Sequence, residues 1–238
     1  MFTKIHNKYY DLRGFDHPGG MVALSLAASR DATELFESHH QFSDKTLIKQ
    51  TLKKYEIRDD QCPENIPSSG VYDWEKSLSS DFTKELKEIA IKVLGKDIKA
   101  SSERLWQYFL LACLLASQFY LFVKGFWVSL LTYPLSIWMF SVNVFHDASH
   151  FSISQQYWRL NSLGMNAGLM LATPYHWYHQ HTIGHHSFPN ILGKDPDLYH
   201  APEALRHSED IPVNSSHCVQ HLLFIIIEAL GIPGNYLV

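Results

Sequence analysis

"LWQYFLLACLLASQFYLFVKGFWVSLLTYPLSIWMFSVNVF" occupies residues 105–145 and contains one formal charge, Lys124. The nineteen residues before this lysine and the twenty-one after it carry no charge. Each run is long enough to cross a bilayer core of about 30 Å as a helix that rises about 1.5 Å per residue. The sequence therefore predicts a transmembrane hairpin, with spans at about 105–123 and 125–145.

The charges around this hairpin predict its orientation. Residues 81–104 hold six Lys or Arg and five acids, a mixture that predicts a solvated helix, whereas the hairpin tip holds one lysine. The positive-inside rule then places the N-terminus and the residues after 145 in the cytosol.

Two more apolar stretches follow the hairpin. Residues 160–173 are too short to span and are predicted to be interfacial or re-entrant. Residues 219–238 are predicted to form a partial third span, interrupted by Glu228 and Pro233. Because this span has no hairpin partner, we expect the sequence to be C-terminally incomplete.

Composition sets limits on the class of protein. The 238 residues have a formal net charge of -4, so the chain lacks the excess of basic residues that is typical of nucleic-acid-binding proteins. Three scattered cysteines favour neither a disulfide framework nor a CxxC site, and the first residues lack a secretory h-region. The Pro/Ser/Gly-rich "CPENIPSSG" (62–70) marks a boundary. We predict a domain at 1–61, a linker at 62–80 and a membrane domain at 81–238.

Histidines gather where the second apolar run ends, in "NVFHDASHF" (143–151). His146 and His150 are four apart, so on a helix they share a face, as metal ligands do. The alternative is a pair of interfacial histidines bonded to lipid or backbone, and the pair alone does not decide between them. Asp147 is a candidate acceptor for a ligand's second ring nitrogen.

A second group lies in "HQHTIGHHSFPN" (179–190). His181 and His185 repeat the four-residue spacing, and His186 is one position further around. Five nitrogen donors from the two groups suit iron, copper or zinc, and the lack of a nearby cysteine argues against a zinc finger. Further histidines lie outside this spacing: His176 and His179 as weaker candidates, and His200, His207, His217 and His221 as ordinary surface or interfacial residues.

"HDASH" and "HTIGHH" resemble the first two histidine boxes of the membrane fatty-acid desaturase family, and "PNILGKDPD" resembles the segment after the second box. The resemblance implies that His146, His150, His181, His185 and His186 are catalytic as ligands of two non-haem irons. The family's third box, HxxHH or QxxHH, does not occur in these 238 residues.

The N-terminal "YYDLRGFDHPGG" (9–20) resembles the first haem-ligand motif of the cytochrome b5 family. In "RDATELFESHH" (30–40), Asp31 and Glu34 have capping-box spacing and predict a helix with an apolar face at Leu35 and Phe36. The family's spacing implies that His17 and His40 bind haem b, with His39 as the alternative second ligand. Two histidine ligands leave no open position on the iron, so such a haem carries electrons.

Together the two resemblances imply an α+β cytochrome b5-like domain followed by an all-α integral membrane domain, the layout of the front-end desaturases. That family uses O2 to insert a cis double bond into a polyunsaturated acyl chain. Its electrons come from NADH through NADH-cytochrome b5 reductase and the fused haem. The implied location is the endoplasmic reticulum membrane, multi-pass, with haem domain and histidine boxes facing the cytosol.

Several alternatives stay open. The double bond could lie at delta-4, 5, 6 or 8, and the substrate could be an acyl-CoA, an acyl lipid or a sphingoid base. A b5-fused hydroxylase would use similar boxes. A membrane-anchored haem carrier, or a histidine-rich scaffold, would perform no acyl chemistry.

Overall fold

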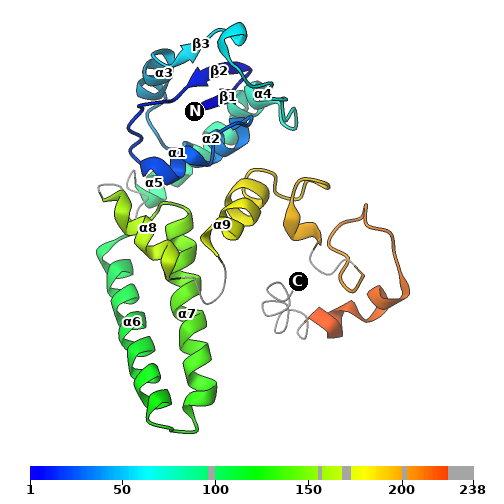
Figure 1. Ribbon diagram of the computed structural model, residues 1–238. Helices are drawn as coiled ribbons and strands as arrows, with labels where there is room; N and C mark the ends of the chain where they lie inside the picture. Colours follow the sequence, from blue (N-terminus) through cyan, green and yellow to red (C-terminus); the bar gives the residue numbers. More distant parts are fainter. Residues whose placement is uncertain (96–99, 155–156, 168–172, 200–202, 225–238) are drawn as a thin grey trace. The chain divides into compact units, whose positions relative to one another are not determined.

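The computed structural model describes residues 1–95, 100–154, 157–167, 173–199 and 203–224 (Figure 1). It divides into two compact units, each considered by itself below. The first contains Met1–Phe109 and His150–Leu163, and the second contains Leu110–Ser149 and Gly164–Val238.

The first unit begins with a small antiparallel sheet. Strands β1 (Phe2–Ile5) and β2 (Lys8–Asp11) form a hairpin in the register Phe2 to Asp11, and β3 (Glu56–Ile57) pairs with β2. The connecting residues His6 and Asn7 have φ angles of 49° and 61°. Two consecutive positive φ values match the right-handed strand twist, so this tight turn fixes the hairpin register.

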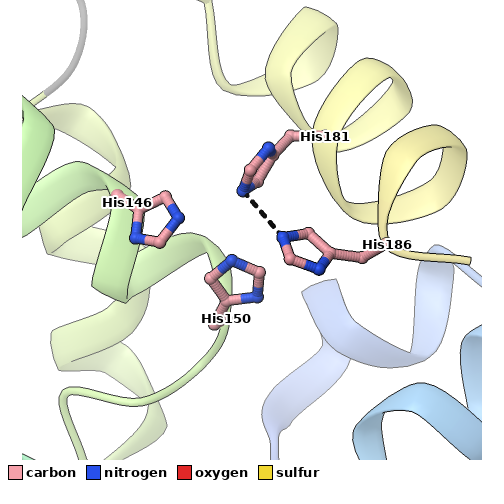
Figure 2. Close-up of side chains that lie close together, drawn as sticks. All are labelled: His146, His150, His181 and His186. Carbon is pink, nitrogen blue, oxygen red and sulfur yellow. Dashed lines mark hydrogen bonds between the residues drawn. The ribbon is translucent and has the colours of Figure 1, made fainter. Parts of the chain in front are cut away.

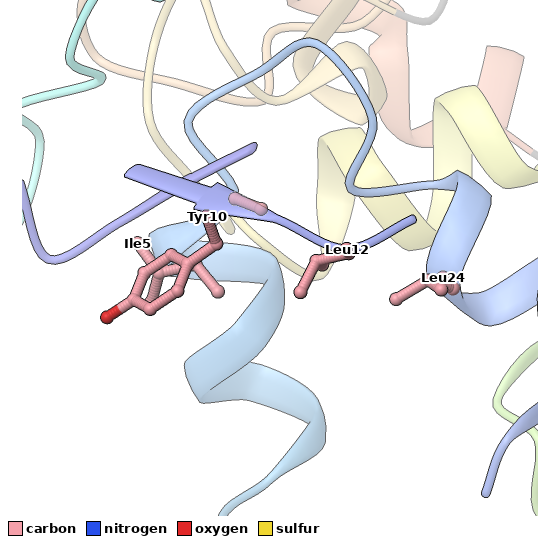
Figure 3. Close-up of a cluster of buried hydrophobic side chains, with 5 residues drawn as sticks. Ile5, Tyr10, Leu12 and Leu24 are labelled. Carbon is pink, nitrogen blue, oxygen red and sulfur yellow. The ribbon is translucent and has the colours of Figure 1, made fainter. Parts of the chain in front are cut away.

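Three short helices pack against the sheet: α1 (Gly20–Ser25), α2 (Thr33–His39) and α3 (Lys45–Lys53), followed by the 3₁₀ turn η1 (Asp59–Gln61). The core is a cluster of buried apolar side chains from strands and helices (Figure 3): Ile5, Tyr10, Leu12, Leu24 and Ala32. Its small size means that polar contacts must help to hold the unit together.

The start of α2 differs from the predicted capping box. The helix begins at Thr33, and Asp31 Oδ1 accepts from the Thr33 backbone N–H at 3.1 Å and from its hydroxyl at 2.6 Å. Glu34 is buried and accepts a hydrogen bond from the Ser69 hydroxyl. The capping-box prediction was therefore wrong, because both carboxylates are used in other contacts.

The Pro/Ser/Gly-rich segment packs against the helices of the first unit. Ile66 is 2% exposed, and Asp31 Oδ2 accepts from the Ser68 hydroxyl at 3.1 Å and from the Ser69 N–H at 3.0 Å. Residues near the predicted domain boundary are thus fixed in place by hydrogen bonds. The boundaries 1–61 and 62–80 stay predictions.

Residues 81–104 do not form the single helix that their charges predicted. After α4 (Trp74–Ser79), α5 (Asp81–Leu94) begins with the Ser80 hydroxyl accepting from the Thr83 N–H at 3.2 Å. It ends at Gly95, whose φ of 78° suits glycine and breaks the helix. Lys96 and Lys99 lie outside the described residues.

Two long helices follow, α6 (Ser102–Val123) and α7 (Ser129–Ser149). In the second unit they are linked by a hydrogen bond from the Thr132 hydroxyl to Gln118 Oε1 at 2.6 Å. In the described part of the chain, α6 alone is long and apolar enough to cross a membrane. The helix expected at 125–145 begins only at Ser129 and contains Pro134, so a second crossing stays a prediction.

The remaining elements are short: α8 (Trp158–Asn166), α9 (Pro174–Trp177), the π-helix η2 (Tyr178–His185), and the 3₁₀ turns η3 (Pro196–Tyr199) and η4 (Ser215–Val219). Within the predicted interfacial stretch, residues 168–172 lie outside the described part of the chain. The same holds for His200 and for residues 225–238 of the predicted third span.

Glu37 joins three elements of the first unit. This residue of α2 is 3% exposed and binds His6 Nε2 at 2.8 Å and Lys45 Nζ at 3.0 Å. Burial alone would raise the pKa of Glu37, but the hydrogen bonds from His6 and Lys45 outweigh it and lower the pKa. A carboxylate whose pKa is lower in the folded state stabilises the fold at pH values above its unfolded-state pKa. This stability is lost as the pH falls through the folded-state pKa.

Replacing Glu37 by Gln should therefore lower the free energy of unfolding at pH 7 by about 1–3 kcal/mol, because two donors lose a charged acceptor. The variant should also lose less stability than the parent between about pH 5 and pH 3. Denaturant unfolding followed by circular dichroism at both pH values measures this. The control is Glu56→Gln, in an exposed pair with Lys8, which should change stability by less than about 0.5 kcal/mol. Equal acid sensitivity of both variants would contradict the role of Glu37.

Candidate functional site

The first unit contains an apolar cavity of about 510 Å³. His17, in the loop before α1, and His40, directly after α2, both line it. Their ring centroids are 6.0 Å apart and their planes are perpendicular. Apolar side chains make up much of the remaining lining, among them Leu24, Leu35, Phe36 and Leu52. The predicted apolar face of α2 is thereby confirmed.

Local contacts orient both rings, in different ways. His40 Nδ1 donates to the Phe36 carbonyl at 2.8 Å, which leaves the lone pair on Nε2. The Gly19 N–H donates to His17 Nδ1 at 3.0 Å. Burial, with a smaller contribution from His40, lowers the pKa of His17 to about 4. The His17 imidazole is therefore neutral at physiological pH, as ligation requires.

A haem fits this arrangement. Metal–imidazole bonds of about 2 Å on each side of one iron would set two ring centroids roughly 6 Å apart, close to the observed separation. The cavity lies within the size range of cofactor pockets, and its apolar walls suit a flat macrocycle. His39 also lines the cavity, but its ring stacks with that of His150, with centroids 6.4 Å apart. The geometry thus favours His40 over His39 as the partner of His17.

The second unit gathers three of the five box histidines. His181 and His186 lie at opposite ends of a π-type turn in which the His186 N–H donates to the His181 carbonyl at 2.9 Å. Their Nε2 atoms are 3.1 Å apart (Figure 2). The α-helical spacing predicted that His181 would share a face with His185. The i,i+5 bonding of the π-helix also pairs His181 with His186, while the rings of His181 and His185 lie stacked with centroids 5.9 Å apart.

His146 of α7 completes this group. Its ring centroid is 5.0 Å from that of His181, and Trp177 packs against both rings. One ligand atom from each of His146, His181 and His186 lies within 4.8 Å of the others, close enough to share a metal ion. Burial, followed by His185 and His146, lowers the pKa of His186, which favours its neutral form.

His150, also drawn in Figure 2, is the first residue after α7 and belongs to the first unit, where it lines the apolar cavity. The other four box histidines belong to the second unit. The predicted acceptor Asp147 lies 3.4 Å from His146 Nδ1, a long contact. The two weaker candidates make other contacts: His176 bonds Gln180 at 3.1 Å, and His179 packs on Tyr175.

His185 is held by two carboxylates that the sequence analysis did not single out. Its Nδ1 lies 3.1 Å from Asp195 Oδ1 and 3.2 Å from Asp197 Oδ2. Gly184 makes this contact feasible, because a Cβ there would lie 2.7 Å from Pro196 Cδ. The segment containing Asp195 and Asp197 can therefore approach the π-helix closely only at a glycine.

Asp195 is 1% exposed. It accepts hydrogen bonds from three donors: the His185 ring, the Asn190 N–H at 2.7 Å and the Asp197 N–H at 3.0 Å. Burial alone would raise the pKa of Asp195, but these hydrogen bonds outweigh it and lower the pKa. A carboxylate on Nδ1 keeps the His185 lone pair on Nε2, the usual way in which a metal-binding imidazole is oriented. In the sequence, the two acids of "GKDPD", which follows the second histidine box, could have indicated this contact.

Comparison with known proteins identifies both parts of the chain. Residues 1–61 match the cytochrome b5-like haem/steroid binding domain, and residues 123–232 match the fatty acid desaturase family. The chain belongs to the fatty acid desaturases that carry an N-terminal cytochrome b5-like domain. The expected fold class, a domain with a small sheet followed by a helical desaturase domain, is confirmed, and so is the predicted resemblance.

Individual relatives show the same layout over part of their length. The chain is 34% identical over 208 residues to a probable Delta(5) fatty acid desaturase C of Dictyostelium discoideum, covering 83% of this chain and 44% of that protein. It is 28% identical over 252 residues to an acyl-lipid omega-13 desaturase of Chlamydomonas reinhardtii, covering 94% and 53%. This desaturase chain thus spans about half the length of the relatives it matches. No solved structure matches it.

The Asp195 contact can be tested through metal affinity. Asp195→Asn should weaken binding of a divalent metal by about 10–100-fold, because an amide cannot accept from all three donors. Titration of the purified chain with Co²⁺, followed by its visible absorption, measures this. Asp197→Asn, at a half-exposed acid, should lose less, and the exposed Asp210→Asn should lose nothing. An unchanged affinity in Asp195→Asn would contradict the positioning role.

Proposed function

We propose that this chain is the electron-receiving and metal-binding part of an oxygen-dependent front-end fatty-acyl desaturase. The observation that carries the proposal is the pair of histidine arrangements on one chain. His17 and His40 face each other across an apolar cavity, and His146, His181 and His186 place their nitrogens within 4.8 Å. Family membership adds the reaction class, because desaturases are membrane-associated oxidoreductases.

The proposed metal ligands are those of the histidine boxes: His146, His150, His181, His185 and His186. When bound, haem would relay single electrons, and two non-haem irons would use O2 to remove two hydrogens from neighbouring methylenes of an acyl chain. The protein's task is to hold the neutral imidazoles in place and exclude water. Trp177 and Phe145 pack beside the cluster, with ring centroids 5.0 Å apart, and supply part of the apolar surroundings.

The electron source and location follow from the same proposal. His17 and His40 would accept electrons from NADH by way of NADH-cytochrome b5 reductase, in the endoplasmic reticulum membrane with the haem domain in the cytosol. The apolar, exposed surface of α6 supports a membrane anchor. Relatives named for acyl lipids and for the Delta(5) position support an acyl-lipid substrate, and one named for omega-13 leaves the position of the double bond to product analysis.

The haem assignment is tested by two neighbouring histidines. His40→Ala should abolish the reduced-minus-oxidised haem spectrum of the purified chain, because the iron loses one of its two ligands. His39→Ala should keep the spectrum, since its ring is stacked on His150 rather than facing His17. The reverse pattern would assign His39 as the ligand and refute His40.

The acyl chemistry is tested by expressing a full-length version that contains this chain in yeast supplied with polyunsaturated fatty acids and analysing products by gas chromatography and mass spectrometry. A new cis double bond is expected, and His181→Ala or His185→Ala should reduce it by at least about 100-fold. The exposed His207→Ala serves as the control. A hydroxylated product would assign a hydroxylase. A haem spectrum without product or non-haem iron would assign an electron carrier.

A further inference from the structure

Helix α5 carries an exposed apolar row that the desaturase assignment does not use. Phe82, Leu86, Ile89 and Val93 are 74%, 55%, 52% and 74% exposed. At about 100° per residue, their three- and four-residue spacing places all four within a narrow stripe on one side of the helix. Soluble surfaces scatter such side chains singly, whereas a continuous stripe of this length marks an interaction surface.

The other sides of α5 are mixed: they carry its charged residues, and Ile91 and Leu94 are 39% and 66% exposed. Lys87 is partly buried and lies near enough to Lys45 and Glu37 to interact electrostatically with them. The helix carries three lysines and three acids between Asp81 and Leu94, so its formal charge is zero. The apolar stripe therefore points away from the body of the first unit, and no net charge selects an oppositely charged partner.

The position of α5 in the chain identifies what covers the stripe. Seven residues, 95–101, separate its end from the start of α6, a connection that can reach at most about 25 Å. The first turns of α6 carry interfacial side chains: Arg104 lies over the Tyr108 ring, and Trp106 is 64% exposed. Trp and Tyr concentrate at the level of the lipid headgroups, so the stripe lies within reach of the bilayer surface.

We infer that α5 lies in the plane of the membrane interface, with Phe82, Leu86, Ile89 and Val93 inserted among the lipid headgroups and upper acyl chains. A helix with a large apolar face and low net charge binds a bilayer through apolar burial. Such a helix would hold the haem domain at the bilayer surface and limit its motion relative to the start of α6. This inference rests on the membrane association of the family and not on turnover.

The test places one fluorescent label at each of two positions in the full chain. Leu86→Cys lies in the stripe, and Glu88→Cys is an exposed matched control on another side of α5. The native cysteines are first replaced by serine: Cys62, Cys113 and Cys218. Each protein is labelled with NBD and reconstituted into nanodiscs of phosphatidylcholine containing a nitroxide-labelled lipid, and circular dichroism checks that the helices are retained.

Lipid-borne nitroxide should quench the label at position 86 at least about twofold more than the label at 88, and aqueous iodide should show the opposite order. Because insertion is apolar, the result should not change between about 50 and 500 mM salt. Equal iodide access at both positions would overturn the inference. So would a label at 86 that both quenchers fail to reach, because a protein surface would then cover it. Energy transfer between differently labelled chains would identify that surface as a second copy. None of these outcomes depends on iron or product, so they are independent of the proposed reaction.

Discussion

His40 and His185 share one constraint on metal binding: one ring nitrogen must be anchored by an acceptor so that the other keeps its lone pair. The Phe36 carbonyl anchors His40, and Asp195 anchors His185. Burial keeps such rings neutral, as the pKa of His17 at about 4 illustrates. The surrounding elements are arranged around these anchors. For His40, helix α2 itself supplies the carbonyl. For His185, the carboxylate comes from Asp195, ten residues further along the chain.

The histidines themselves could be found from the sequence, because four- and five-residue spacings around polar side chains are rare next to long apolar runs. Their pairing could not. The α-helical rule predicted that His181 and His185 would share a face, but not that the π-helix also brings His181 to His186. A choice between i→i+4 and i→i+5 bonding depends on packing, and no local pattern records it.

The charged segment before α6 shows a different limit. Its lysines and acids predicted a solvated helix over residues 81–104. In the structure the helix is shorter, Asp81–Leu94, and carries an exposed apolar stripe. The spacing of Phe82, Leu86, Ile89 and Val93 was available in the sequence, but a stripe facing lipid and a stripe facing a protein core have the same period. Exposure in the folded chain is what separates them. The predicted second membrane crossing rests on composition in the same way. Helix α7 contains Pro134 and several polar residues, and an average over the apolar run does not register their positions.

The contacts of the second histidine box also determine how much of the chain must be moved with it if it is grafted into another protein. Pro196 packs on Gly184, and Asp195 binds His185, so residues 195–196 return to the middle of the continuous stretch 177–197. The aromatic ring of Trp177 lies against His181 inside the same stretch. A transplant of "HTIGHH" alone into another helical scaffold would lose both the carboxylate and the π-turn. The smallest unit that could be grafted with its orientation intact is therefore a loop-closed segment of about twenty residues, a length set by the return path of the chain rather than by the histidines.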